Sequence, residues 1–200
     1  MKTVVIATRN EKKLAEIRAI LAGSVRVLGL SEVEQDLPEV EEDGETFSDN
    51  AIKKAVTIAR ITGLLTLADD SGLVVDALGG EPGVRSARFA GEETTTGKNN
   101  ALLLERLQGV PEARRTARFV CVIALADGTG LLETFEGTCE GIITLSPRGS
   151  GGFGYDPLFF LPERAVTFAE LEPLEKNRIS HRGRALEQAA RHLHQRVATG

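Results

Sequence analysis

The segment Thr116–Ala126 is apolar on both faces of an extended strand, and this constrains the fold more than any other part of the chain. Alternate side chains of a strand point to opposite faces. One face carries Ala117, Phe119, Cys121 and Ile123, and the other carries Val120, Val122 and Ala124. A strand that is apolar on both faces has to be covered on both, so the pattern predicts a strand in the middle of its sheet.

Length and charge limit the size and the partners of the protein. The chain has 200 residues, of which 42% are hydrophobic and 26% charged, which predicts one domain or one compact two-lobed unit with a sizeable core. The net charge of -5 provides no basic field for a nucleic-acid polymer or an anionic membrane, so we expect neither as a partner. An acidic protein that binds a polyanion must gather its positive groups locally or use a metal.

The two cysteines and the N-terminus predict where the protein works. Cys121 and Cys139 lie in strand-like runs, without a CxxC motif or a histidine at ligand spacing. This favours buried free thiols and a reducing cytoplasm. The chain begins directly with a strand-like run and has no long apolar segment there. We therefore expect neither a signal peptide nor a transmembrane helix at the N-terminus.

The N-terminal region reads as a strand, a polar turn and a helix. Residues 2–7 are predicted to form a buried strand, residues 8–13 are polar, and apolar residues then recur at helical spacing over about 12–22. Free backbone N–H groups and the helix dipole favour an anion at such a junction, and Lys13 is close enough to reach the same anion. An ordinary helix capped by Asn10 with exposed lysines fits the same residues, so both interpretations stay open here.

Two adjacent acids, Asp69 and Asp70, follow the apolar run that ends at Ala68. The spacing predicts a short buried strand up to Ala68, a turn over 68–72 that carries Asp69 and Asp70, and a second short strand over 73–75. Neighbouring carboxylates repel each other and cost desolvation, so they are useful mainly where a cation sits or a proton moves. The alternative is an Asx-type turn in which both acids are solvated.

An acidic loop precedes this region. The predicted loop over 36–44 carries four acids within five positions: Glu39, Glu41, Glu42 and Asp43. They fit a solvated loop, or a loop that completes a hard-cation site if it folds over the acids at 69 and 70. A helix over about 48–62, capped by Thr46 or Ser48, follows the loop.

The second half of the chain adds a long loop, a helix and a hairpin. Residues 79–91 form a loop with two arginines that is too apolar to be disordered, so we expect a functional loop. A helix is predicted over 96–107, a hairpin around Asp127-Gly128 with its partner strand over 131–139, and a continuation of the sheet over 141–145.

A glycine-rich segment at 147–157 matches G-x-G-x-x-G literally. We reject a dinucleotide-binding turn because a strand-like run, 158–160, follows where that motif requires a helix. The glycines beside Phe153 and Tyr155 fit either a slot for a base or a plain flexible loop.

Cations gather near the start of the last helix. Ser180 is its predicted cap, so His181 and Arg182 stand at a helix N-terminus. The helix dipole disfavours cations there, and we therefore expect an anion or a hydrogen-bond partner beside them.

Taken together, six ordered motifs resemble the inosine triphosphate pyrophosphatase family, also called dITP/XTP pyrophosphatases. The resemblance extends from residue 4 to about 190. The motifs are Thr8-x-Asn10-x-x-Lys13-x-x-Glu16, Glu42-x-Gly44-x-Thr46-Phe47-x-x-Asn50-Ala51, Ala68-Asp69-Asp70-Ser71-Gly72-Leu73, Pro82-Gly83-x-x-Ser86-Ala87-Arg88, Gly152-Phe153-Gly154-Tyr155-Asp156-Pro157 and Ser180-His181-Arg182-Gly183.

The resemblance implies a fold and an activity. The expected fold is α/β, a single domain over 1–200 with a long mixed central sheet and two lobes, and with the substrate in the cleft between them. The implied enzyme is a hydrolase acting on acid anhydrides, a cytoplasmic homodimer that requires Mg²⁺. It would convert ITP, dITP and XTP to the monophosphate and pyrophosphate, and so remove deaminated purines before a polymerase uses them.

The resemblance also implies roles for individual residues. Asp70 would accept a proton and bind the metal, with Asp69 supporting it. Glu41 is our choice for the second metal ligand, with Glu42 as a near competitor. Ser71 would contact the substrate. The triphosphate would be held by Thr8, Arg9, Asn10, Glu11, Lys12 and Lys13. The base would be surrounded by Phe153, Gly154, Tyr155, Asp156 and Lys176, with His181 and Arg182 at its 6-oxo edge.

Two rival functions remain at this stage. One is a sister pyrophosphatase that acts on pyrimidine or modified nucleotides. The other is a regulatory protein that binds a nucleotide without turnover, against which the many carboxylates argue.

Overall fold

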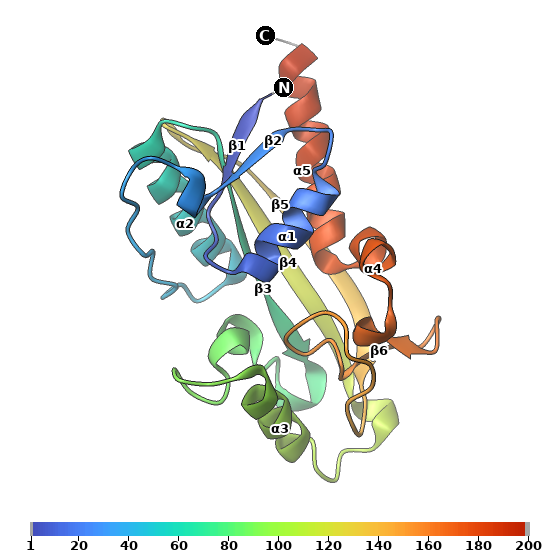
Figure 1. The fold of residues 1–200 in the computed structure, drawn as a ribbon. Helices are drawn as coiled ribbons and strands as arrows, with labels where there is room; N and C mark the ends of the chain where they lie inside the picture. The colour runs from blue at the N-terminus through green and yellow to red at the C-terminus, as the bar shows by residue number, and fades with distance from the viewer. Residues whose placement is uncertain (1, 199–200) are drawn as a thin grey trace. The chain divides into compact units, whose positions relative to one another are not determined.

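The computed structural model describes residues 2–198, with side chains up to Gln195, and its strands form one mixed sheet (Figure 1). Among the described residues the sheet has seven strands in the order β2-β1-β3-β4-β5-β6-β7. Strand β1 pairs in parallel with β2 and β3, whereas β6 pairs antiparallel with β5 and β7. The strands are β1 Thr3–Ile6, β2 Arg26–Gly29, β3 Thr66–Val75, β4 Thr116–Asp127, β5 Gly130–Ile143, β6 Phe159–Leu161 and β7 Val166–Thr167. The predicted α/β class with a mixed central sheet is confirmed.

The chain divides into two compact units. The first comprises the described residues up to Asp70, residues 121–137 and those from Arg182 on, and the second comprises residues 71–120 and 138–181. Among the described residues the α-helices are α1 Glu11–Ile20, α2 Phe47–Thr62, α3 Thr96–Arg106, α4 Pro173–Ile179 and α5 His181–Ala198. None of the helices within residues 2–198 combines the length and the apolarity that a bilayer span requires.

In the first unit, helices cover both faces of the sheet. Figure 1 shows α1 and α5 on one face and α2 on the other. Successive residues of β4 alternate between two cores: Cys121 and Ile123 pack with α1 and α5, and Val122 and Ala124 pack with α2. The prediction that this strand is apolar on both faces and central in its sheet is therefore confirmed.

The second unit has an aromatic core of its own. Phe119, Phe159 and Phe168 pack against one another with ring centroids 4.6 to 5.7 Å apart, and Leu103 and Leu107 at the end of α3 join the same cluster. Aromatic side chains are large, so each of these rings buries a large apolar surface.

The predicted turn over 68–72 is wrong. Strand β3 runs without interruption from Thr66 to Val75, so Asp69, Asp70 and Ser71 belong to a strand. The Asx-type turn with solvated acids is excluded as well, because Asp69 and Asp70 are 1% and 4% exposed. The sequence prediction treated paired acids followed by Ser-Gly as a turn signal, but the ionic partners described below stabilise the acids inside the sheet.

Helix boundaries follow the predicted caps closely. The Asn10 side chain accepts hydrogen bonds from the backbone N–H groups of Lys12 and Lys13, as a cap of α1. Thr46 rather than Ser48 caps α2, and Gly63 ends it in the left-handed region with φ 66°.

Three segments differ from the expected elements. Residues 79–91 are not a plain loop, since Gly83–Arg88 forms a 3₁₀ helix after a cis Glu81-Pro82 bond. The two strands predicted over 131–139 and 141–145 are one long strand, β5, which runs from Gly130 to Ile143. The short helix α4 was not predicted, although the proline at its first position is a start signal.

Candidate functional site

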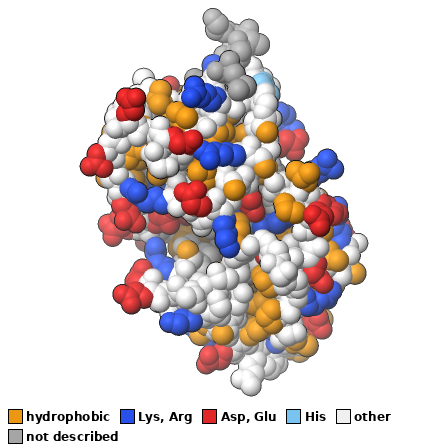
Figure 2. All heavy atoms as spheres, in the orientation of Figure 1, with side chains coloured by type: hydrophobic (Ala, Val, Ile, Leu, Met, Phe, Trp, Pro, Cys, Tyr) orange, Lys and Arg blue, Asp and Glu red, His pale blue; other side chains and the backbone are white. Residues whose placement is uncertain are grey.

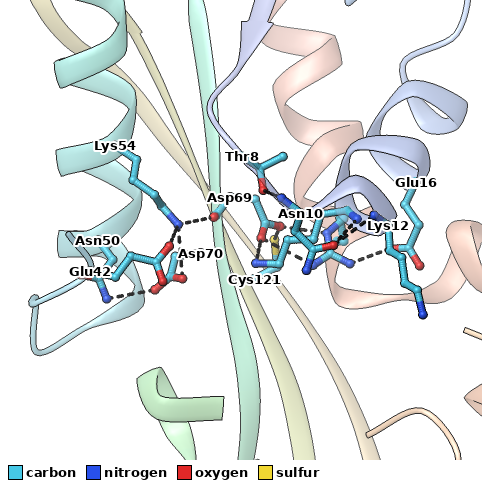
Figure 3. A network of polar contacts seen from close by, with 12 residues as sticks. Thr8, Asn10, Lys12, Glu16, Glu42, Asn50, Lys54, Asp69, Asp70 and Cys121 are labelled. Atoms are coloured by element: carbon cyan, nitrogen blue, oxygen red, sulfur yellow. Dashed lines mark hydrogen bonds and ion pairs between the residues drawn. The ribbon is translucent and has the colours of Figure 1, made fainter. Parts of the chain in front are cut away.

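Asp69 lies at the centre of a buried ionic network in the first unit (Figure 3). Its carboxylate accepts a hydrogen bond from Arg182 Nε at 2.9 Å and forms an ion pair with Lys13 Nζ. A second carboxylate, Glu16, accepts from Arg182 Nη1 at 2.6 Å. Cys121 Sγ lies 3.0 Å from Asp69 Oδ2. The network therefore joins α1, β3, β4 and α5.

The cations decide the charge state of Asp69. Burial opposes its ionisation, but Arg182 and Lys13 outweigh burial and hold the pKa of Asp69 well below its ordinary value. Burial, followed by the nearby Asp69 charge, raises the pKa of the Cys121 thiol well above its ordinary value. The network thus contains an ionised carboxylate beside a neutral thiol.

Asp70 belongs to a different cluster, centred on Lys54 of α2 (Figure 3). Lys54 Nζ donates to the Asp69 backbone carbonyl at 2.7 Å, pairs with Glu42, and lies 3.5 Å from Asp70 Oδ1. Asn50 Nδ2 donates to Asp70 Oδ2 at 3.1 Å. Two residues of α2 therefore contact the Asp70 carboxylate, and Lys54 links it to the acidic loop through Glu42.

The environment leaves Asp70 more basic than an ordinary aspartate. Burial raises its pKa, and Glu42 and Asp69 add to the rise, while Lys54 and Lys13 oppose it. Burial disfavours the charge on Lys54, yet Asp70 and Glu42 outweigh burial and raise its pKa. An ammonium beside a carboxylate of raised pKa is an arrangement that can hold and move a proton.

The predicted phosphate-binding turn lies at the N-terminus of α1. Thr8 Oγ1 accepts from the Asn10 backbone N–H at 3.2 Å, and Asn10 caps the helix through the amides of Lys12 and Lys13. Arg9 is bound elsewhere, because its Nη2 donates to the Leu37 carbonyl at 2.9 Å. A phosphate that used these groups would have to exchange with the Asn10 carboxamide and with the Asp69 partner of Lys13.

The residues predicted around the base lie in the second unit. Lys176 Nζ is 2.6 Å from Asp156 Oδ2 and 4.9 Å from the centroid of the Phe153 ring. The Phe153 N–H donates to the same Asp156 oxygen at 2.8 Å. The pair therefore holds the half-buried Phe153 ring in place over an ammonium group.

Tyr155 lies in the core of the second unit. Its side chain is packed among the aromatic residues and its hydroxyl donates to the Ser86 carbonyl at 2.8 Å. Burial raises the pKa of Tyr155. Of the two rings that the sequence pairs at this loop, only Phe153 is partly exposed, while Tyr155 is 4% exposed and braces the 3₁₀ turn at 83–88.

His181 and Arg182 are adjacent in sequence but belong to different units. The His181 ring stacks on Phe119, with centroids 4.7 Å apart and planes 10° apart. The Arg182 guanidinium belongs to the Asp69 network. The sequence predicts an anion or a hydrogen-bond partner for a cation at this helix N-terminus. For Arg182 these partners are the carboxylates of Glu16 and Asp69.

The donor set of the Lys54 cluster fits a hard cation. Within residues 2–198, no three acidic, histidine or cysteine side chains form a group that could hold a metal by themselves. Mg²⁺ is commonly held by one or two carboxylates, with substrate phosphates and water completing its shell. Asp70 and Glu42, which share Lys54, meet this requirement, whereas Glu41 lies on the exposed side of the loop.

Four residues in these clusters were not predicted as site residues: Glu16, Asn50, Lys54 and Cys121. Asn50 and Lys54 are 1% and 8% exposed, although both lie on a helix with an exposed face. A polar residue at a core position of a helical pattern is a signal for them, because such residues need a partner.

Charges are mixed on the surface. Figure 2 shows acidic and basic side chains interspersed over the visible face. The cations of the candidate site in the first unit, Lys13, Lys54 and Arg182, are instead paired with carboxylates in two clusters that are largely buried.

Known proteins match nearly the whole chain. The model of the Ham1 family matches residues 4–192. A dITP/XTP pyrophosphatase from Geobacter sulfurreducens is 58% identical over 194 residues, which are 96% of this chain and 97% of that protein.

Solved structures match as well. A HAM1 protein from Coxiella burnetii has a TM-score of 0.87 and 44% identity, and the match covers 98% of this chain and all of that chain (100%). A nucleoside-triphosphatase / dITP/XTP pyrophosphatase from Mycobacterium abscessus has a TM-score of 0.76 and 45% identity over 94% of this chain and 98% of that chain.

Substitution of Asp69 tests the buried network. Asp69→Asn leaves Lys13 and Arg182 without their shared charge, so we expect the free energy of unfolding to fall by about 3–5 kcal/mol at pH 7 in urea titrations. The pKa of Asp69 is lower in the folded than in the unfolded protein. The contribution of its ionised carboxylate to the free energy of unfolding is therefore complete above the ordinary pKa of an aspartate, and it is lost as the pH falls through the folded-state pKa.

The difference in the free energy of unfolding between the wild type and Asp69→Asn should therefore become smaller below about pH 4. Glu187→Gln, which removes an exposed pair with Arg191, is the control and should leave the free energy of unfolding nearly unchanged. An equal difference at pH 3 and pH 7 would contradict the assigned charge state of Asp69.

Proposed function

Because the chain belongs to the Ham1 family, we propose that it is a nucleoside triphosphate pyrophosphatase. It hydrolyses ITP, dITP and XTP to the monophosphate and pyrophosphate, and so keeps deaminated purines out of DNA and RNA. The names of its relatives support this activity. The observation that carries it in the chain itself is the buried Asp70 carboxylate, which shares the Lys54 ammonium with Glu42.

The reaction follows from the chemistry of that cluster. A water molecule attacks the α-phosphorus, the bond from this phosphorus to the bridging oxygen of the β-phosphate breaks, and pyrophosphate leaves. Asp70 accepts the proton of the water, for which its raised pKa suits it. Lys54 stabilises the carboxylate in its ionised form before the proton arrives.

The triphosphate brings several negative charges that must be neutralised. We propose that residues 8–13 bind it through the N-terminus of α1 and the Lys13 ammonium. Mg²⁺ would be held by Asp70 together with Glu41 or Glu42, and when bound it neutralises phosphate charge and activates the α-phosphorus toward attack. Ser71, the residue after Asp70, would contact the same substrate.

Base recognition is assigned to residues around Phe153. The Phe153 ring, held by Asp156 and Lys176, offers a stacking surface for a purine. Gly154 and Tyr155 would contribute through their backbone, since the Tyr155 ring is buried. His181 and Arg182 would donate to the 6-carbonyl, which hypoxanthine and xanthine have and adenine lacks. A site built on such hydrogen bonds discriminates strongly against a base that cannot form them.

The proposal extends to the cellular location and the assembly of the protein. Cys121 and Cys139 are buried thiols outside any disulfide, which suits a reducing cytoplasm. Family resemblance favours a homodimer, so light scattering after size exclusion should give about twice the chain mass of 21.5 kDa. A single-chain mass at micromolar concentration would remove this part of the proposal.

Pyrophosphate release from a panel of nucleotides tests the activity. We expect rapid release from ITP, dITP and XTP with Mg²⁺ and none with EDTA, because a divalent cation is required. Release from ATP and UTP should be slow because neither base offers the purine 6-carbonyl, and release from GTP, which has this carbonyl, should be slow because its 2-amino group is rejected. Pyrophosphate and phosphate are measured separately. A preference for UTP or dTTP would favour the pyrimidine-acting alternative. Tight binding without turnover would favour a regulatory protein. Release of single phosphate would mean that water attacks the γ-phosphorus instead of the α-phosphorus.

Substitution of Asp70 tests the mechanism. Asp70→Asn removes the proton acceptor and one of the candidate metal ligands, so we expect kcat to fall by about 10²–10⁴ while circular dichroism stays native. The matched control is Asp76→Asn, directly after the end of the same strand, whose carboxylate pairs with Arg118 at the surface. Asp76→Asn should keep near-normal turnover, and near-normal turnover of Asp70→Asn would remove Asp70 from its role.

A further inference from the structure

We propose that Asn50 is a positioning residue, whose single carboxamide fixes both the Asp70 carboxylate and the acidic loop that carries Glu42. The proposal rests on the proposed function in one respect, since it takes Asp70 as the group that accepts the proton. It assigns no substrate contact to Asn50.

The two ends of the Asn50 carboxamide bind two different groups. Oδ1 accepts a hydrogen bond from the Gly44 backbone N–H at 2.8 Å, and Nδ2 donates to Asp70 Oδ2 at 3.1 Å. An N–H requires an acceptor and a carboxylate requires a donor, so only one orientation of the amide satisfies both. Asn50 is 1% exposed, and water therefore does not compete for either bond.

These bonds define how Asp70 is presented. Asn50 occupies Oδ2, while Oδ1 faces Lys54 Nζ at 3.5 Å. A carboxylate held at one oxygen cannot rotate freely, so the two oxygens have separate environments. We infer that Asn50 keeps one oxygen directed at the ammonium and the reacting groups, which is the preorganisation that catalysis needs.

The same carboxamide fixes the acidic loop. Glu42, two residues before Gly44, pairs with Lys54. A Cβ at position 44 would lie 2.7 Å from Asn50 Oδ1 and 2.7 Å from Asp49 Cβ, so only glycine lets the backbone approach this closely. Gly44 does not have a positive φ, and space rather than backbone strain therefore requires glycine here.

Asn50 is not needed to cap its helix. Thr46 and Asp49 already satisfy the first turn of α2 through a reciprocal pair of hydrogen bonds. A buried amide that does not serve the helix end and binds a catalytic carboxylate is better explained by its action on that carboxylate.

Two variants separate the two bonds. Asn50→Asp keeps the shape and the acceptor for Gly44 but replaces the donor to Asp70 by a like charge, and Gly44→Ala displaces the acceptor end. For both we expect kcat with ITP and Mg²⁺ to fall about tenfold to a hundredfold with KM changed less than about threefold, because a hydrogen bond to a charged group is lost or distorted.

The control removes another link between the same loop and the same helix. Lys53 pairs with Asp43 at the surface, where the two side chains are 42% and 55% exposed. Lys53→Gln should leave kcat within about twofold of the wild type. A rise in KM with normal kcat in the Asn50 variants would overturn the proposal in favour of substrate binding, and normal values of both would overturn it altogether.

A double-mutant cycle with Asp70 separates positioning from a structural role. Asn50→Leu is compared with the wild type, and then Asn50→Leu/Asp70→Asn is compared with Asp70→Asn, in single turnovers with excess enzyme. If Asn50 acts through Asp70, its loss costs less than about threefold once Asp70 is already replaced. A full loss in both backgrounds would overturn the proposal. Should Asn50→Leu fail to fold, the cycle is run with the isosteric Asn50→Asp.

Failure of this proposal is distinguishable from failure of the proposed function. The wild-type rate on ITP, dITP and XTP tests the function, whereas the ratio of variant to wild type tests Asn50. If the wild type prefers another nucleotide, the same ratios are measured on that nucleotide.

Discussion

The buried pairing of Asp69 with Lys13 and Arg182 is the interaction on which the rest of the site depends. It joins residues separated by 56 and 113 positions in the sequence. Removing three charges from water is costly, and the cost is recovered only when geometry and hydrogen bonds are good. Such a network is weak evidence for stability. Its clear effect is to fix the start of α1, and with it Lys13, relative to the strand that carries Asp70.

The alternation of side chains along β3 explains how two adjacent acids avoid each other. Successive residues of a strand point to opposite faces. Asp69 faces the side of the sheet covered by α1 and α5, and Asp70 faces α2. Each acid therefore has its own cation, and the pKa values shift in opposite directions. Asp69 is therefore kept ionised and Asp70 can accept a proton, so the two neighbouring carboxylates have different chemical roles.

The sequence was sufficient for most elements and for part of the site. Caps such as Asn10 and Thr46, and the two-sided apolar pattern of Thr116–Ala126, are local signals, so the helices and the central strand were predictable. The turn at 68–72 was mispredicted because its reason to stay extended is non-local: cations from α1, α2 and α5 stabilise the acids.

Details of the clusters depend on tertiary structure. A run of adjacent acids gives no register, and only the fold brings Glu42, rather than Glu41, to Lys54. From the local sequence alone, Lys54 and Asn50 are ordinary helix residues. Their partners belong to the loop and to β3, which pack against them only in the folded protein. The separation of His181 from Arg182 likewise depends on which unit each side chain enters, and adjacency in sequence carries no such information.

The balance of charge in the first unit bears on how a triphosphate could bind. Its two clusters contain three cations, Lys13, Lys54 and Arg182, and four carboxylates, Glu16, Glu42, Asp69 and Asp70. Each cation already has a carboxylate partner, so the clusters offer no excess positive charge to a polyanion. A triphosphate that arrived alone would compete with these carboxylates for Lys13 and Lys54. A divalent cation that bound between the phosphates and the carboxylates would turn that repulsion into attraction, which is a physical argument for the proposed Mg²⁺ requirement.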